Sequence, residues 1–224
     1  RHAVTKLSHI HFPATKDAAK RIIKMGEDPQ MVFEVGCPYI DVIKNTNHKS
    51  KDYLSKKYKF NVDKKIIIFT QHPVTTEYGQ SFDQVKISIN ALRKISNCQI
   101  LAFYSNTDAG GKKIVNELKK QSDYNLIPNM DSSDFLGLMN CADVMVGNSS
   151  AGIREAPSFR LPAVNLGSRQ QGRLRAQNVI DVDHSKTEIT KAINKALYDK
   201  NFIASLKNIT NPYGDGKSAL RIVK

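Results

Sequence analysis

The stretch DVMVGNSSAGIREA (residues 143–156) joins a short apolar run to a helical pattern through small polar residues. The run Val144-Met145-Val146 is typical of a buried strand. The Gly-Asn-Ser-Ser-Ala-Gly segment then places hydroxyls and free backbone N–H groups at the start of a helix predicted over 150–158, a position that attracts phosphate. Because Ser and Asn are also ordinary helix caps, the stretch predicts a strand–turn–helix unit with either a phosphate site or simple capping at its turn.

Five further apolar segments resemble this one, and helical patterns alternate with them. Each segment is short and nearly continuously apolar, as expected for a strand covered on both faces. The six predicted strands are 64–70, 98–103, 124–127, 143–147, 161–166 and 178–182. Apolar residues three to four positions apart predict further helices over 81–95, 110–121, 131–141 and 185–199. This alternation indicates βαβ units, so we expect an α/β fold with a Rossmann-like parallel sheet.

The composition narrows the classes of protein to consider. A chain of 224 residues with 40% hydrophobic and 25% charged residues is typical of a globular protein. No apolar run approaches the roughly 20 residues of a membrane span, so no membrane partner is expected. Three widely spaced cysteines suit reduced thiols, which predicts a cytoplasmic protein. The net charge of +13 would suit nucleic acid, but 25 of the 34 basic residues are lysines that mostly dot helical faces, so no nucleic-acid partner is expected.

Polar residues follow the predicted strands, at the edge of a parallel sheet where ligands bind. His72 follows the first strand, and Pro73 keeps it out of helical conformation. This histidine suits a general acid or base, a phosphate contact or a purely structural hydrogen bond. Asn106 and Met130 follow the second and third strands, and Arg169 follows the fifth, where its planar fork suits phosphate.

The stretch 143–156 contains four more candidate residues. The hydroxyls of Ser149 and Ser150 suit a diphosphate at the positive end of a helix, or act only as caps. Gly152 allows a ligand or another backbone to approach closely, or relaxes the first turn. The carboxylate of Glu155 suits the vicinal diol of a ribose, although acidic residues are common in first turns without any ligand.

Several common cofactor signatures do not occur in the chain. There is no GxGxxG motif, no Walker loop and no CxxC pair. The chain therefore lacks the signatures of NAD binding, of ATP binding by a P-loop and of structural zinc. We expect neither a cofactor nor a metal.

Seven motifs occur in an order that resembles one family, the hydrolysing UDP-N-acetylglucosamine 2-epimerases. The resemblance is strongest to the sialic-acid-biosynthesis branch, which includes bacterial enzymes and the epimerase half of the animal bifunctional epimerase/kinase. The motifs are RHAVTKLSHIHFPAT (1–15), VGCPYID (35–41), QHPVTT (71–76), NTDAGG (106–111), GNSSAGIRE (147–155), NLGSRQQGR (165–173) and YGDG (213–216). Each is weak alone, but together they extend the resemblance over the whole chain.

The resemblance implies a GT-B architecture, in which two Rossmann-like domains face each other across a cleft. The chain then corresponds to the C-terminal part. Residues 1–34 are expected to be the end of the N-terminal domain and the connection, and residues 35–210 the C-terminal nucleotide-binding domain. Residues 211–224 are expected to hold a helix that crosses back to the N-terminal domain. The resemblance also implies a homo-oligomer, a dimer or tetramer, for the full-length protein.

The resemblance also implies a reaction and roles for particular residues. The family eliminates UDP from UDP-GlcNAc with loss of the C2 proton and then adds water, which gives N-acetylmannosamine. By resemblance, His72 is the catalytic-site histidine, Asn106 contacts the ligand and the backbone at Met130 meets the uracil. Ser149 and Ser150 match the diphosphate-binding pair, Glu155 the ribose carboxylate and Arg169 a nucleotide-site arginine. The family's acid/base carboxylates are expected outside this chain, which alone should bind nucleotide weakly and turn nothing over.

Three other functions stay open at this point. One is the same reaction on a UDP-linked diacetamido-trideoxy sugar, which the bacterial branch also includes. A second is a glycosyltransferase of the same architecture, which would consume UDP-GlcNAc only when an acceptor is present. A third is a basic nucleic-acid-binding domain, which would bind DNA or RNA with a steep dependence on salt.

Overall fold

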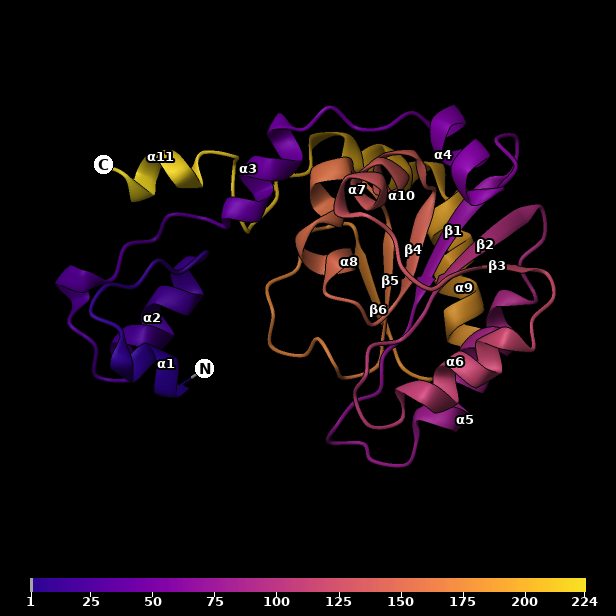
Figure 1. Cartoon of the computed structure of the whole chain (residues 1–224), viewed down its shortest axis with the longest axis horizontal. Helices are drawn as coiled ribbons and strands as arrows, with labels where there is room; N and C mark the ends of the chain where they lie inside the picture. Colours follow the sequence, from indigo (N-terminus) through magenta and orange to yellow (C-terminus); the bar gives the residue numbers. More distant parts are fainter. Residues whose placement is uncertain (1) are drawn as a thin grey trace. The chain divides into compact units, whose positions relative to one another are not determined.

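The computed structural model describes residues 2–224, and their contacts divide the chain into two compact units (Figure 1). The first unit comprises the segment up to Asn47 together with Thr210–Lys224. The second unit, His48–Ile209, contains the sheet and most of the helices. The predicted boundaries at 34/35 and 210/211 concern a two-domain protein longer than this chain, and they stay a prediction.

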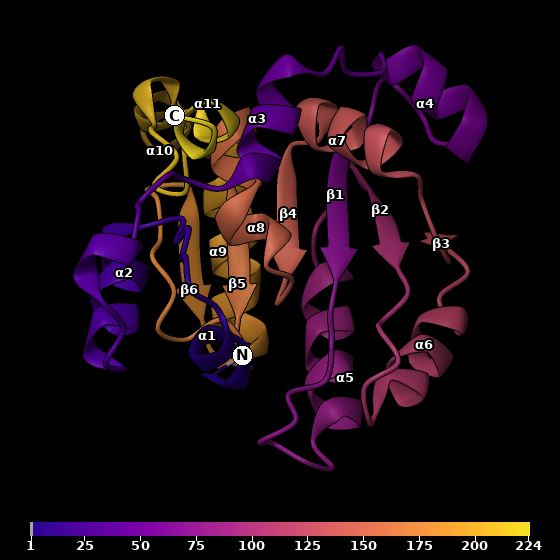
Figure 2. The same ribbon diagram turned by 60° about the vertical axis from the view of Figure 1, so that its left-hand side comes forward.

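A single parallel sheet of six strands forms the centre of the second unit within the described residues. The strands are β1 (Lys65–Thr70), β2 (Cys98–Phe103), β3 (Tyr124–Ile127), β4 (Val144–Gly147), β5 (Ala163–Leu166) and β6 (Val179–Val182). Their order is β3-β2-β1-β4-β5-β6, and every neighbouring pair is parallel. In Figure 2 the arrows of β1, β2 and β4 run side by side in the same direction. All six predicted strands are confirmed, and with them the α/β class.

Apolar residues cover both faces of the sheet, which explains why the strands are almost continuously apolar. Along β1, Ile67 and Phe69 belong to one core cluster, and Ile66 and Ile68 belong to another on the opposite face. All four side chains are fully buried. Since successive residues of a strand point to opposite faces, one strand contributes to two cores.

Helices pack against both faces, as Figure 1 shows for α7 and α8 on one side and for α5, α6 and α9 on the other. The helices of the second unit are α4 (Lys51–Tyr58), α5 (Ser81–Leu92), α6 (Gly111–Lys119), α7 (Ser132–Cys141), α8 (Ala151–Arg154), α9 (Lys186–Tyr198) and α10 (Lys200–Ser205), with short 3₁₀ helices η2 (Ala156–Phe159) and η3 (Leu206–Asn208). The helices predicted over 81–95, 110–121, 131–141 and 185–199 are confirmed as α5, α6, α7 and α9, with shorter ends.

The helix predicted over 150–158 is instead a single turn, α8, followed by the separate 3₁₀ turn η2. Pro157 lies in the first positions of η2. A proline has no N–H to continue an α-helix and disfavours helical conformation in the residue before it, so the helix stops early. Glu155 therefore lies at the end of α8 rather than one turn into a longer helix.

The first unit combines both ends of the chain. It contains α1 (His2–Leu7), α2 (Lys16–Lys24), the 3₁₀ turn η1 (Pro29–Met31), α3 (Pro38–Asn45) and α11 (Ser218–Ile222). The Asp41 carboxylate accepts hydrogen bonds from the backbone N–H groups of Ser218 and Ala219, at 3.0 and 2.8 Å. A side chain of α3 thus caps α11, which fixes the C-terminal helix to a residue 177 positions earlier in the chain.

Candidate functional site

The sheet order reverses between β1 and β4, and a crevice is expected at the carboxyl ends of these two strands. From β1 the chain proceeds outward to β2 and β3, and then returns to place β4 on the other side of β1. Such a reversal point is where open α/β sheets bind ligands. Thr70 at the end of β1 pairs with Gly147 at the end of β4. His72 and Ser149 follow these two strand ends, so the sheet brings together two motifs that are far apart in the sequence.

Only glycine fits the end of β4. Gly147 has φ +134°, a conformation that side chains rarely adopt. A Cβ atom there would lie 1.9 Å from the carbonyl oxygen of Thr70. The absence of a side chain lets the two backbones approach closely, and it sets where Asn148 and the two serines emerge.

The His72 imidazole is neutral, and its environment fixes the position of its proton. The backbone N–H of Asn106 donates to Nδ1 at 3.1 Å, with the Ser105 hydroxyl 3.4 Å from the same atom. Because Nδ1 is an acceptor, the proton of the neutral ring is on Nε2. Burial, together with the positive charge of Arg169, lowers the pKa of His72 to about 4, although Asp108 opposes the shift. The ring therefore presents an Nε2–H donor at neutral pH, rather than a free base.

Asn148 connects the residues of the crevice, and the sequence analysis did not single it out. Its side chain is fully buried and bonds to both main-chain groups of His72: Oδ1 accepts from the N–H at 2.7 Å, and Nδ2 donates to the carbonyl at 2.8 Å. Its own carbonyl accepts from Arg169 at 3.1 Å and from the Gln170 amide at 2.7 Å. The sequence does show that Asn148 directly follows a predicted buried strand. It does not show its hydrogen-bond partner, because His72 lies 76 residues away.

The two serines of the stretch 143–156 directly precede α8. The Ser149 hydroxyl accepts from the Ala151 N–H at 3.3 Å, while Ser150 is the N-cap residue and makes no side-chain cap bond. Gly152 is buried, and a Cβ atom there would lie 3.3 Å from the Cβ of Ala163 on β5. The sequence suggests that Gly152 either allows a close approach or relaxes the first turn. The structure supports a close approach, and the neighbour that approaches is β5.

Two predicted ligand contacts carry buried oxygens without a protein partner among the described residues. These atoms are Oε2 of Glu155 and Oδ1 of Asn106. Burial raises the pKa of the Glu155 carboxyl above its ordinary value, although Arg154 and Arg173 oppose the shift. An unpaired buried acceptor is costly, so both oxygens suit hydrogen bonds from a ligand hydroxyl or amide. Nδ2 of Asn106 donates to Asp108 at 2.5 Å, which orients that side chain.

Arg169 lines a polar cavity of about 330 Å³ at this edge of the sheet. The lining comes from three loops: residues 73–76 after β1, Asp108 after β2, and Ser168, Arg169 and Gln171 after β5. The Ser168 hydroxyl also donates to the Glu77 carboxylate, which ties the loop after β5 to the loop after β1. Met130 follows β3, the edge strand, and is half-buried. The structure thus groups His72, Asn106, Arg169 and the serines near adjoining strand ends, with Met130 on the outer side.

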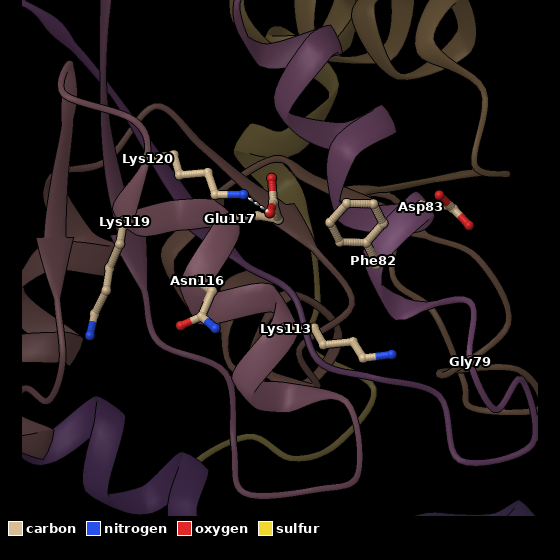
Figure 3. A pocket seen from close by; sticks show the side chains of 8 residues that line it. All are labelled: Gly79, Phe82, Asp83, Lys113, Asn116, Glu117, Lys119 and Lys120. Carbon is tan, nitrogen blue, oxygen red and sulfur yellow. Dashed lines mark hydrogen bonds and ion pairs between the residues drawn. The ribbon is translucent and has the colours of Figure 1, made fainter.

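A second, larger cavity of about 690 Å³ lies between α5 and α6 (Figure 3). Its lining includes Phe82, Lys113 and Lys119, and Glu117 forms an ion pair with Lys120. None of the predicted site residues lines it. Within residues 2–224, no group of three His, Cys, Asp or Glu side chains is arranged to hold a metal ion. No described helix has the length and apolar character needed to cross a bilayer.

The sheet order and the crevice define a doubly wound α/β domain with a ligand site at its reversal point. A sequence profile of the UDP-N-acetylglucosamine 2-epimerase family matches residues 1–224, so the chain belongs to this family. It is 37% identical to the UDP-N,N'-diacetylbacillosamine 2-epimerase (hydrolyzing) of Legionella pneumophila, over 99% of the chain and 58% of that protein. It is 35% identical to the UDP-N-acetylglucosamine 2-epimerase of Neisseria meningitidis, over 88% of the chain and 52% of that protein. The predicted family is confirmed.

Solved structures show the same fold. The UDP-GlcNAc 2-epimerase from Neisseria meningitidis bound to UDP-GlcNAc matches 98% of this chain and 61% of its own length, with a TM-score of 0.79 and 21% identity. MnaA from S. aureus, solved with UDP, gives a TM-score of 0.76 at 24% identity over 98% of this chain and 59% of its own. The chain thus has the fold of about 60% of a GT-B-like epimerase, as predicted. It spans roughly half to three fifths of the length of these relatives.

Proposed function

We propose that the protein containing this chain is a hydrolysing 2-epimerase of a UDP-linked 2-acetamido sugar, and that this chain holds the UDP. The supporting observation is the crevice between β1 and β4, where a neutral imidazole, an arginine and two hydroxyls follow adjoining strands. The family to which the chain belongs supports the class of reaction. The anomeric C–O bond breaks, the C2 proton leaves, and water then adds to the resulting glucal.

The residues of this chain suit the departure of UDP better than the removal of the C2 proton. In the proposed complex, Ser149, Ser150 and the charge of Arg169 bind the diphosphate, whose negative charge grows as the C–O bond breaks. The Nε2–H of His72 donates a hydrogen bond to a departing oxygen. A ring with its proton on Nε2 and a pKa of about 4 is a poor base at neutral pH, so the C2 proton is taken by another group. By family resemblance, we expect that group to be a carboxylate outside this chain.

The remaining proposed contacts concern the nucleoside. The unpaired Oε2 of Glu155 accepts from a ribose hydroxyl, which satisfies a buried acceptor that has no protein partner in residues 2–224. The unpaired Oδ1 of Asn106 accepts in the same way from a ligand donor. The backbone at Met130 is proposed to meet the uracil, on family resemblance alone. Gly152 is proposed to let the ligand approach closely, because it has no side chain.

Two acetamido sugars are candidate substrates. UDP-GlcNAc would yield N-acetylmannosamine for sialic-acid synthesis, as the motif resemblance implies. The relatives from Legionella pneumophila and Campylobacter jejuni are instead named for diacetylbacillosamine, and they are 37% and 35% identical to this chain over 99% and 81% of its length. This observation favours a UDP-linked diacetamido-trideoxy sugar as the second candidate.

The test is release of UDP from each nucleotide sugar by the native protein, with no acceptor added. We expect UDP and the 2-epimerised free sugar from one of the two substrates, and a loss of at least about 100-fold in kcat for His72→Ala. Turnover that requires an acceptor would indicate a glycosyltransferase. Absence of UDP release from both sugars, together with DNA or RNA binding that UDP does not displace, would refute the proposed function.

A further inference from the structure

Asn148 forms several hydrogen bonds with other residues of the crevice, but it is not one of the proposed ligand contacts. Asn148 is fully buried. The oxygen and the nitrogen of its side-chain amide each form a hydrogen bond with the main chain of a single residue, His72. Its backbone N–H donates to Thr70 at 3.1 Å and its carbonyl accepts from Arg169 and Gln170. One residue therefore joins the loops that follow β1, β4 and β5.

We propose that Asn148 is a positioning residue that holds the imidazole of His72 at a fixed place relative to Arg169 and the two serines. This inference rests on the proposed function of the crevice. The side chain acts on the loop after β1, and the main chain of the same residue acts on the loop after β5. A shift of any one of these groups against the others is thereby resisted, and the diphosphate meets a preorganised set of donors.

His72 needs the hydrogen bonds from Asn148 because the backbone hydrogen bonds between β1 and β4 end before it. The last paired residues are Thr70 and Gly147, so His72 lies beyond regular strand pairing. Pro73, which follows, has no N–H to contribute a further bond. The Asn148 amide replaces the missing ladder pair, with one acceptor for the His72 N–H and one donor for its carbonyl.

The amide supplies this pair of bonds from two separate atoms of one short side chain, with the donor on nitrogen and the acceptor on oxygen. An aspartate keeps the acceptor but lacks the donor, and it brings a negative charge beside the His72 carbonyl. The charged groups that already act on His72 are Arg169 and Asp108. An added carboxylate would oppose the effect of Arg169 and favour the protonated ring.

The test compares Asn148→Asp with a matched variant, Asn125→Asp, in the native protein. Asn125, on β3, also donates from its side chain to a main-chain carbonyl, that of Tyr58, at 2.5 Å. For Asn148→Asp we expect kcat to fall about 100-fold, since a misplacement of about 1 Å can cost that much. The dissociation constant of UDP should rise by a smaller factor than kcat falls, because Ser149, Ser150 and Glu155 remain. The pKa of His72, followed by NMR, should rise by at least about one unit.

For Asn125→Asp we expect kcat and the His72 titration to match the wild type. If Asn148→Asp does not fold, Asn148→Ser replaces it; its hydroxyl can make one of the two bonds, and we expect a loss in kcat of about tenfold. A wild-type kcat in the Asn148 variants, or an equal loss in Asn125→Asp, overturns the proposal while leaving the epimerase activity intact. A wild-type protein that releases no UDP from either sugar overturns both the proposed function and the role of Asn148.

Discussion

Lowering the pH should leave His72 uncharged well below the point at which an ordinary histidine titrates. Its pKa is lowered from 6.5 to about 4, first by burial and then by the charge of Arg169. At pH 5.5 an ordinary histidine is about 90% protonated, whereas a group with a pKa of about 4 is only about 3% protonated. The hydrogen bond from the Asn106 N–H also requires that the neutral ring carry its proton on Nε2.

The same shift links His72 to stability. Between pH 6.5 and about 4 the unfolded chain takes up a proton at this position that the folded chain does not. The stability due to the neutral ring is therefore fully present above pH 6.5 and is lost as the pH falls through this window. A shift from 6.5 to about 4 corresponds to about 3 kcal/mol over the whole window. The glutamine of His72→Gln cannot titrate. Between pH 7 and pH 4, the free energy of unfolding of this variant should therefore fall about 3 kcal/mol less than that of the wild type.

Two measurements check this prediction in the native protein. Long-range ¹H–¹⁵N spectra of histidine-labelled protein report both the pKa and the protonated nitrogen of His72. Urea unfolding at pH 7 and pH 4 of wild type and His72→Gln reports the linkage, and the difference between the two proteins removes the contribution of all other titrating groups. A His72 pKa near 6.5, or a proton on Nδ1, would contradict the proposed donor role. Parallel pH dependence of the two proteins would contradict the linkage.

Further predictions concern the backbone, a buried carboxylate and the nucleoside contact. Gly147→Ala should lower the free energy of unfolding by at least about 3 kcal/mol, because its Cβ would meet the Thr70 carbonyl. Gly172→Ala, at a positive φ but with open space around the added Cβ, should cost about 1 kcal/mol in urea titrations. Asp134→Asn should lower the melting temperature more than Asp131→Asn, since the first carboxylate is buried against Lys57 and Tyr58 and the second is 75% exposed. Glu155→Gln should weaken UDP binding about tenfold by calorimetry and should remove the preference for UDP over 2′-deoxy-UDP; an unchanged preference would refute the ribose contact.

The strands and four of the main helices could be predicted because their signal is local. Strands such as β1 are short apolar runs, and helices such as α9 place apolar residues on one face. Helix α4 (KDYLSKKY) escaped prediction because only Leu54 in it is buried. Ser50 caps its start, and its Lys57 and Tyr58 bond to Asp134 on α7, more than seventy residues away. Contacts of this kind cannot be detected from a pattern within the segment.

The candidate site was predictable as a list of residues but not as an arrangement. That polar residues follow parallel strands could be inferred from the alternation of strands and helices. Which of these ends adjoin depends on the strand order, and no local pattern encodes that β4 returns to the side of β1. The clamp formed by Asn148 on His72 depends on this return and on the register Thr70–Gly147. The roles assigned to His72, Asn106 and Glu155 as ligand contacts stay predictions.

The strand order also affects how the chain is synthesised. One edge of β1 pairs with β2 soon after both leave the ribosome, but its other edge waits for β4, whose last residue is Gly147. At about 5–20 residues per second, the wait lasts on the order of 4–15 seconds. During that interval Ile67, Ile68 and Phe69 offer an unpaired apolar edge to other nascent chains. The strand order that creates the crevice therefore also leaves one edge of β1 unpaired during synthesis, and aggregation should be most severe when translation pauses before residue 144.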